Sequence, residues 1–382
     1  MNGDWSSVRS PSVRYPNQRF RVRPRLVAVI AMVMFFILIL LLMPESKSRT
    51  GGSFDMRNRL IFAPSTMYNG SYPGSIPVKT VGGKKYKIGL VADLDTDSKD
   101  KENPKIWNSY LKTGYLTLNG HHDGLTIEWE DNRLLTSQFS QGGRGMELSE
   151  LIIFNGKTYT VDDRTGVVYE IIDNRVVTWV ILPDGDGTAS KGFKAEWMAV
   201  KDQHLYIGGL GKEWTTTTGE LVNLNPQWVK VISHLGEVKH IQWSKNYNAM
   251  RKSAGYEYPG YMIHESGVWS EHHQQWFFLP RRASTLRYDE VEDEHRATNI
   301  LLRCSADFEQ VTVTRIGTLN AIRGYSSFKF IPGTRDQIIV ALKTEENHGE
   351  IATFITAFNI KGVIIYKDEK IADNKFEGIE FI

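Results

Sequence analysis

Short clusters along this chain combine acidic, basic and flexible residues of the kinds that handle phosphate groups. Asp93 and Asp95 lie two residues apart behind an apolar stretch, so a continuing strand would present both carboxylates on one face. Similar mixtures of carboxylates, cations, glycines and aromatic rings occur at residues 143–149, 162–166, 194–196, 208–214 and 281–282. A pyrophosphate needs cations and a bridging metal around its oxygens, and hard cations such as Ca2+ take oxygen ligands. Each cluster alone has the composition of an ordinary polar turn, so the prediction depends on the clusters meeting.

A repeated pattern would bring oxygen atoms from distant parts of the chain to one axis. Five segments begin with an oxygen-bearing residue and carry apolar residues two and four positions later, which is the period of a strand. The leading residues are Ser149, Glu196, Glu265, Ser326 and Glu377, and a family resemblance described below contributes to the choice of these five among similar segments. The third segment is degenerate, because Gly267 takes its first apolar place. Three carboxylates and two serine oxygens around one axis predict a site for a hard cation.

The spacing of these segments predicts the fold that must position them. They follow one another at intervals of 47, 69, 61 and 51 residues, the length of a four-stranded propeller blade with its loops. From residue 86 onward, short strand patterns alternate with turns, and Asn155-Gly156 separates two strand-like runs as in a type I′ hairpin. Helical periodicity is limited to residues 246–254. We therefore expect an all-β, five-bladed β-propeller over residues 85–382.

The first 84 residues differ in composition from the rest. Residues 1–25 hold six arginines and one acid, residues 26–43 are an unbroken apolar run of 18, and residues 44–84 are rich in turn-forming residues. Such a run is about the shortest that crosses a bilayer, and the arginines place the tail in the cytosol. We expect a basic cytosolic tail, a transmembrane signal anchor and a luminal stem with a glycosylation site at Asn69. The alternative is a cleaved secretory signal.

Composition and missing motifs exclude several classes of protein. The chain has 46 basic and 44 acidic residues and a net charge of +2, so nothing in it suggests nucleic acid as the partner. Cys304 is the only cysteine, which excludes an intrachain disulfide and favours a quiet strand residue over a nucleophile. The residues around Lys212 do not complete a phosphate-binding P-loop, and neither a nucleophile elbow nor an H-E-x-x-H zinc motif occurs.

Longer motifs extend these clusters into a series that covers most of the chain. They include Asp-Leu-Asp-Thr at 93–96, Arg-Gly-Met-Glu-Leu-Ser at 144–149, Val-Asp-Asp-Arg-Thr-Gly at 161–166 and Lys-Gly-Phe-Lys-Ala-Glu-Trp at 191–197. Others lie at residues 208–215, 264–266, 279–284, 326–330 and 377–382. In order and content the series resembles the calcium-activated nucleotidase (apyrase) family, which includes secreted apyrases of blood feeders and a vertebrate Golgi member. The resemblance runs from about residue 86 to the C-terminus.

The resemblance implies a five-bladed propeller that holds one calcium ion in its central channel and hydrolyses nucleoside diphosphates. By motif position, it implies calcium ligands at Ser149, Glu196, Glu265, Ser326 and Glu377. It implies catalytic residues at Asp93, Glu147, Asp163, Lys194 and Arg281. It implies nucleotide contacts from Asp95, Arg164, Lys212, Trp214 and Arg282. Among these we expect Asp93 or Asp163 to orient the attacking water, and Lys194 and Arg281 to bind phosphate.

The anchor is similar to that of the vertebrate Golgi type, which implies work inside the secretory pathway. We expect hydrolysis of UDP and GDP, and less of ADP, in the lumen of the Golgi or endoplasmic reticulum, where it would support glycosylation. Release by later cleavage and a homodimer are left open. Two alternatives are a propeller glycoside hydrolase and a non-catalytic calcium-binding luminal propeller. Cations such as Lys194 and Arg281 suit phosphate better than a neutral sugar.

Overall fold

The computed structural model describes residues 67–382, whose strands form five large sheets and one small one. The first large sheet contains β1 (Val78–Thr80), β2 (Gly83–Asp93), β3 (Trp107–Asn119), β4 (Leu125–Ser137) and β23 (Lys375–Glu380). The second contains β5 (Leu148–Phe154), β6 (Lys157–Asp162), β7 (Val167–Ile172) and β8 (Arg175–Ile181). The third contains β9 (Trp197–Lys201), β10 (His204–Gly208), β13 (Trp228–Ser233) and β14 (Val238–Gln242).

Two further sheets complete the set. The fourth contains β15 (Tyr261–Ser270), β16 (Gln275–Ser284), β17 (Ile300–Ser305) and β18 (Val311–Arg315). The fifth contains β19 (Arg323–Phe330), β20 (Ile338–Asn347), β21 (Glu350–Asn359) and β22 (Ile364–Ala372). The small sheet pairs β11 (Trp214–Thr215) with β12 (Leu221–Asn223). Short helices lie in the connections: η1 (Asp95–Ser98), η2 (Asn225–Gln227), α3 (Ser244–Ala254) and α4 (Glu290–Asp293).

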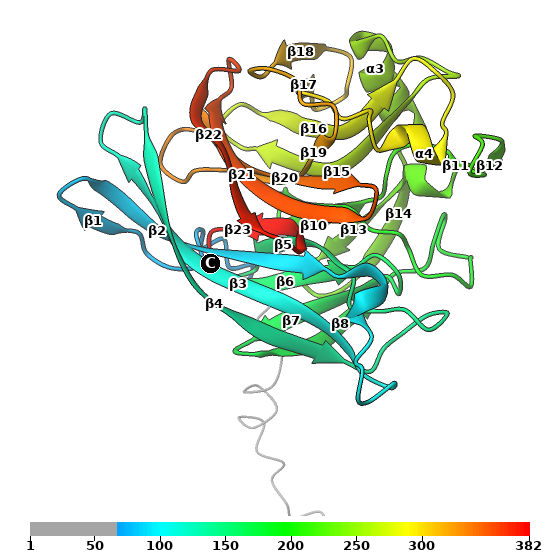
Figure 1. Cartoon of the computed structure of the whole chain (residues 1–382), viewed down its shortest axis with the longest axis horizontal. Helices are drawn as coiled ribbons and strands as arrows, with labels where there is room; N and C mark the ends of the chain where they lie inside the picture. The colour runs from blue at the N-terminus through cyan, green and yellow to red at the C-terminus, as the bar shows by residue number, and fades with distance from the viewer. Residues whose placement is uncertain (1–66) are drawn as a thin grey trace, which may run out of the picture. The chain divides into compact units, whose positions relative to one another are not determined.

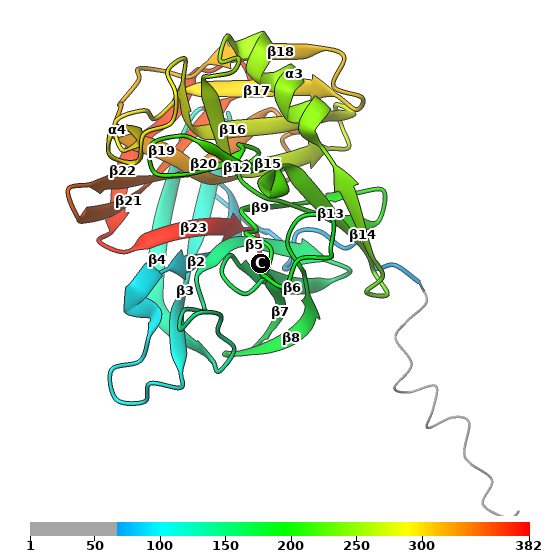
Figure 2. The same cartoon turned by 90° about the vertical axis from the view of Figure 1, so that its right-hand side faces the viewer.

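The five large sheets are the blades of a propeller, as the spacing predicted. The strands β5, β9, β15, β19 and β23 each form one edge of a sheet, and each contacts the next in a closed ring. The C-terminal strand β23 pairs antiparallel with β2, so the two ends of the fold share one blade (Figure 1). Figure 2 shows the red β23 between the other strands of this blade and the strands of the fifth. The five predicted segments are therefore the innermost strands of the five blades.

The apolar core lies between neighbouring blades. Leu90, Ile355 and Ile379 belong to one buried cluster that joins the first and fifth blades, and Trp197 and Trp276 belong to another that joins the third and fourth. Inner strands are buried on both faces, and all seven residues of β5 are buried. Polar residues within the inner strands, such as Glu150 and Ser327, are therefore buried as well.

Local turn chemistry agrees with two further predictions. Asn155 and Gly156 have φ angles of 50° and 70° and connect β5 to β6, as a type I′ hairpin requires. The one helix predicted from periodicity is α3, and Gly255 ends it with a φ of 83°. Cys304 is buried on β17, in agreement with its interpretation as a structural strand residue rather than a nucleophile.

The N-terminal predictions fall largely outside the described residues. This applies to the cytosolic tail (1–25), the transmembrane anchor (26–43) and most of the stem (44–84). Within residues 67–382, no helix is both long and apolar enough to cross a membrane. The described end of the stem lies against the last strand, where Gly74 N–H donates to the Phe381 carbonyl at 3.0 Å and the Tyr72 hydroxyl donates to Glu380 at 2.9 Å.

Candidate active site

Most of the leading oxygen-bearing residues lie where an inner strand carries a β-bulge. Strand pairing skips Ser149 in β5, Ser326 in β19 and Glu377 in β23, and in β15 it skips Glu265 together with its neighbour. Glu196 directly precedes β9, and its N–H donates to the Gly208 carbonyl at 2.8 Å. A bulge takes a residue out of the hydrogen-bonded ladder and re-aims its side chain. The inner strands therefore each carry an irregularity, or a strand start, at the predicted ligand.

Arg281 connects acidic groups from three strands at the axis. One guanidinium nitrogen contacts Glu265 and lies 2.9 Å from Glu377, and the other lies 2.7 Å from Glu346. Arg281 is also a residue that strand pairing skips, in β16. Burial lowers the pKa of Arg281, but the carboxylates more than offset this and hold it well above its ordinary value. The side chain is therefore a permanent buried cation among three acids.

Lys194 forms a second group between two acids. Its ammonium contacts Asp163, which follows β6, and lies 2.9 Å from Glu196. The Asp163 oxygen that faces away from Lys194, Oδ1, is buried and has no hydrogen-bond partner among residues 67–382. Burial raises the pKa of Asp163, although Lys194 counteracts the shift. One oxygen of Asp163 is thus available to accept a hydrogen bond from a bound molecule.

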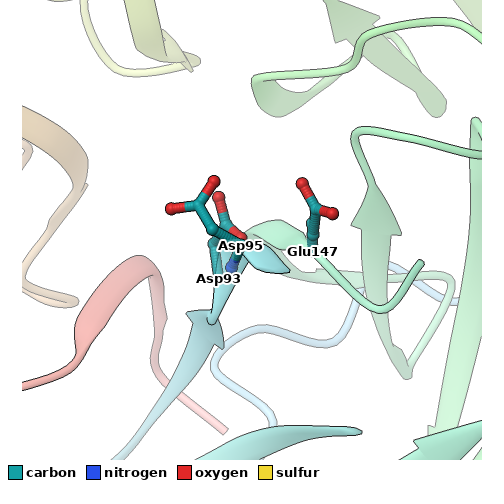
Figure 3. A group of neighbouring side chains, drawn as sticks. All are labelled: Asp93, Asp95 and Glu147. Carbon is teal, nitrogen blue, oxygen red and sulfur yellow. The ribbon is translucent and has the colours of Figure 1, made fainter. Parts of the chain in front are cut away.

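Glu147 is held by two arginines beside the aspartates of the β2 end. Arg144 donates two hydrogen bonds of 2.6 Å to its carboxylate, and Arg164 donates one of 2.9 Å. One oxygen each of Asp93, Asp95 and Glu147 lies within 4.8 Å of the other two (Figure 3). A backbone hydrogen bond also joins the segments after β6 and before β5, because Asp163 N–H donates to the Glu147 carbonyl at 3.0 Å. The loops after β2, before β5 and after β6 therefore converge.

Lys375 and Glu346 also belong to the site, although the sequence prediction did not include them. The Lys375 ammonium lies 2.7 Å from both Asp93 and Asp95 and 3.4 Å from Glu346. A signal for Lys375 was present, because it precedes Glu377 by two residues, as Lys194 precedes Glu196. Each lysine therefore lies two positions before a predicted calcium ligand. Glu346 had no such signal, since its surroundings in β20 read as a solvated strand end.

The ion-paired side chains described above form one group, here called the axial network, which contains more acids than cations. Its carboxylates belong to Asp93, Asp95, Glu147, Asp163, Glu196, Glu265, Glu346 and Glu377. Its cations are Arg144, Arg164, Lys194, Arg281 and Lys375. Eight carboxylates against five cations leave a formal charge of −3 in a mostly buried region.

The pKa values show the effect of this crowding. Burial, followed by the charges of Asp163 and Asp93, raises the pKa of Glu147 to about 8. Burial raises the pKa of Glu196 to about 8 as well, against the opposing effect of Lys194. Burial also raises the pKa of Glu377 well above its ordinary value, whereas Arg281 lowers that of Glu346 to about 2. An added cation would favour the ionised form of the raised groups.

The axial residues fit a hard metal ion by charge and by donor type. All five predicted ligands offer oxygen atoms. The raised pKa values of Glu196 and Glu377 mean that a bound cation would favour their ionised forms. The Ser149 hydroxyl is buried and, within the described part of the chain, lacks a hydrogen-bond partner. Calcium accepts six to eight such oxygen ligands in flexible geometry. The donor types therefore suit calcium, but within residues 67–382 the mutual spacing of 4.8 Å or less is met by Asp93, Asp95 and Glu147 and not by Glu196, Glu265 and Glu377.

Three predicted nucleotide contacts lie in a neighbouring region rather than in the axial network. Lys212 donates to Thr215 at 2.8 Å and lies 4.0 Å from the centre of the Tyr288 ring, and burial lowers its pKa to about 8. Arg282 donates to the Glu294 carbonyl at 2.6 Å, away from the partners of Arg281. Trp214 lies on β11, with Lys191 4.5 Å from the centre of its ring.

Asn69, the predicted glycosylation site, is exposed next to the β5–β6 turn. Its N–H donates to the Asn155 side chain at 2.7 Å, and its own side-chain oxygen accepts from Ser71 N–H at 3.0 Å. Glycosylation at this position stays a prediction.

Comparison with known proteins identifies the family. The family model described as Apyrase matches residues 94–382. A rat protein named soluble calcium-activated nucleotidase 1 is 52% identical over 95% of this chain and 91% of its own length. Proteins named apyrase from Cimex lectularius and apyrase apy-1 from Caenorhabditis elegans are 43% and 46% identical, over 83% and 78% of this chain and 88% and 85% of theirs. The chain therefore belongs to the calcium-activated nucleotidase (apyrase) family.

Proposed function

We propose that this chain is a calcium-dependent hydrolase that converts nucleoside diphosphates to monophosphates and phosphate. The proposal is supported most directly by the mixed axial network, in which buried carboxylates surround Arg281, Lys194 and Lys375. Carboxylates suit a calcium ion, whereas arginine and lysine suit the oxygens of a diphosphate. The names of the relatives, which mention calcium activation, nucleotidase and apyrase, agree with both halves of this assignment.

Ser149, Glu196, Glu265, Ser326 and Glu377 are the residues proposed to hold calcium. When bound, the ion would polarise a phosphoryl oxygen and neutralise developing negative charge. Lys194 and Arg281 would bind the phosphate groups through charge-assisted hydrogen bonds. In doing so, they would exchange part of their present contacts with Asp163, Glu265 and Glu377 for contacts with the substrate.

Asp163 is our choice over Asp93 for the group that orients the attacking water. Among residues 67–382, one buried oxygen of Asp163 has no hydrogen-bond partner, whereas Asp93 accepts from Asp95 N–H at 2.8 Å and pairs with Lys375 at 2.7 Å. Its raised pKa also suits a group that takes up a proton during the reaction. Glu147 accepts hydrogen bonds from Arg144 and Arg164 and would hold these two cations in position beside the substrate.

The experiment is phosphate release by the purified chain from UDP, GDP, ADP and their triphosphates, with calcium, with magnesium or with a chelator. We expect diphosphates, and UDP and GDP before ADP, to be hydrolysed with calcium, and no activity with the chelator. Equal turnover with magnesium alone would contradict the calcium assignment. A glycoside hydrolase would be inactive on every nucleotide. A non-catalytic propeller would show no turnover in the wild type, so Asp163→Asn and Arg281→Met would change nothing in this assay.

We also propose that the enzyme works in the lumen of the Golgi or endoplasmic reticulum, anchored by residues 26–43. The support is the apolar run with its preceding arginines and the sequon at Asn69. A mobility shift on deglycosylation, lost in Asn69→Gln, and resistance to alkaline extraction from membranes would test both parts. Recovery of the whole protein in the medium would favour a secreted form, and sedimentation of the purified chain would test the homodimer.

A further inference from the structure

A second buried polar cluster, formed by Glu150, Ser327 and Lys329, lies directly behind the proposed calcium ligands. One Glu150 oxygen, Oε1, accepts from the Ser327 hydroxyl at 2.9 Å and lies 3.0 Å from the Lys329 ammonium. Glu150 and Ser327 are fully buried, and Lys329 is 4% exposed. Among residues 67–382, no ion pair or hydrogen bond joins these three residues to the ion-paired network at the axis. The cluster is therefore separate from the groups proposed to meet substrate.

The cluster connects three of the five inner strands. Glu150 belongs to β5, whereas Ser327 and Lys329 belong to β19, which is not its neighbour in the ring. The strand between them, β23, joins through Ile379, whose N–H donates to the Ser327 hydroxyl oxygen at 3.2 Å. Close approach depends on Gly378, because a Cβ there would lie 2.5 Å from the Leu151 nitrogen. These bonds run between blades rather than within one.

Each connected strand carries a proposed calcium ligand next to the cluster. Ser149 precedes Glu150, Ser326 precedes Ser327, and Glu377 lies two residues before Ile379. All three ligands lie at bulges, where ladder hydrogen bonds do not hold the backbone. Their relative positions must therefore be set by something other than strand pairing.

We propose that Glu150, Ser327 and Lys329 are positioning residues that fix the spacing of the calcium ligands on β5, β19 and β23. The inference rests on the proposed function, since it assumes that these ligands bind calcium. A metal site whose ligands come from separate strands binds tightly only when the strands are already held at the right spacing. Glu196, directly before β9, and Glu265, on β15, are held by Lys194 and Arg281, and Glu377 is held by Arg281 as well as through the cluster. The ring thus uses two means of positioning.

Calcium binding by the full chain, measured by calorimetry without nucleotide, tests this inference. Ser327→Ala removes both the donor to Glu150 and the acceptor for Ile379. We expect it to weaken calcium affinity roughly tenfold or more, the size typical of changes behind metal ligands. Turnover at saturating calcium should stay near the wild-type value. Glu150→Gln keeps an oxygen for Ser327 but loses the charge facing Lys329, and we expect a smaller loss of affinity.

Ser266→Ala is the matched control. Ser266 is equally buried and also follows a proposed ligand, Glu265, but its hydroxyl donates to the Leu279 carbonyl within its own blade at 2.9 Å. We expect its calcium affinity to stay near that of the wild type. Unchanged affinity in both Ser327→Ala and Glu150→Gln, or an equal loss in Ser266→Ala, would overturn the inference. Absence of calcium binding by the wild type would instead refute the proposed function.

Discussion

Replacement of Arg281 should make the stability of this protein depend strongly on calcium. Arg281→Met keeps most of the aliphatic stem but leaves Glu265, Glu346 and Glu377 without their shared cation. The Arg281 and Glu377 side chains are each 5% exposed, so solvent screens their interaction weakly. Removal of one partner from such a buried pair costs about 3 to 5 kcal/mol. Glu346 is 34% exposed and should contribute little to this cost.

Calcium should restore much of the lost stability. An ion bound between the same carboxylates supplies the missing positive charge, so the variant should bind calcium more tightly than the wild type and gain more stability from it. The assay is denaturant unfolding of wild type and variant, each with chelator and with saturating calcium. We expect the deficit of Arg281→Met to be largest with chelator and to shrink with calcium by about 1.4 kcal/mol for each tenfold by which the variant binds calcium more tightly than the wild type.

Arg323→Met provides the control for this experiment. Arg323 also pairs with two carboxylates, Glu345 at 2.9 Å and Asp368 at 3.2 Å, but neither belongs to the axial network. Its deficit should be the same with and without calcium. If the deficit of Arg281→Met were also independent of calcium, the proposed sharing of Glu265 and Glu377 between arginine and calcium would be wrong.

Three further changes probe separate parts of the site. Glu196→Gln removes one of three proposed carboxylate ligands and should lower calcium affinity in a direct titration; an unchanged titration would remove Glu196 from the ligand set. Lys212 loses its proton as pH rises through its lowered pKa of about 8, so the KM for nucleotide should rise above this pH. Lys212→Arg keeps the charge and should flatten that profile, whereas an identical profile would exclude Lys212 as its source. Trp214→Ala should weaken binding of every nucleotide by about 1–3 kcal/mol, the worth of one stacked base, and an effect on a single base would contradict simple stacking.

The sequence alone determined the blades and their innermost strands. A period of two reports which residues share a face of a strand, and that information is local. Repetition at intervals of 47 to 69 residues then favours one such strand in each blade, and the family resemblance helps to select these five among similar segments, including the one that Gly267 weakens. The Asn155-Gly156 turn and the helix before Gly255 were predictable for the same reason, because neighbouring residues decide both.

The tertiary structure decided which charged groups meet. Arg281 and Arg282 are adjacent, yet Arg281 lies in a bulge among axial acids, while Arg282 contacts the Glu294 carbonyl. Lys375 and Glu346 enter the site because β23 closes the ring beside β2 and β20. The Lys375–Asp93 pair joins residues 282 positions apart and the Arg281–Glu377 pair joins residues 96 positions apart, so both follow from blade packing and ring closure. No local pattern carries that information, because the free energy that selects such contacts comes from burying whole blades against one another.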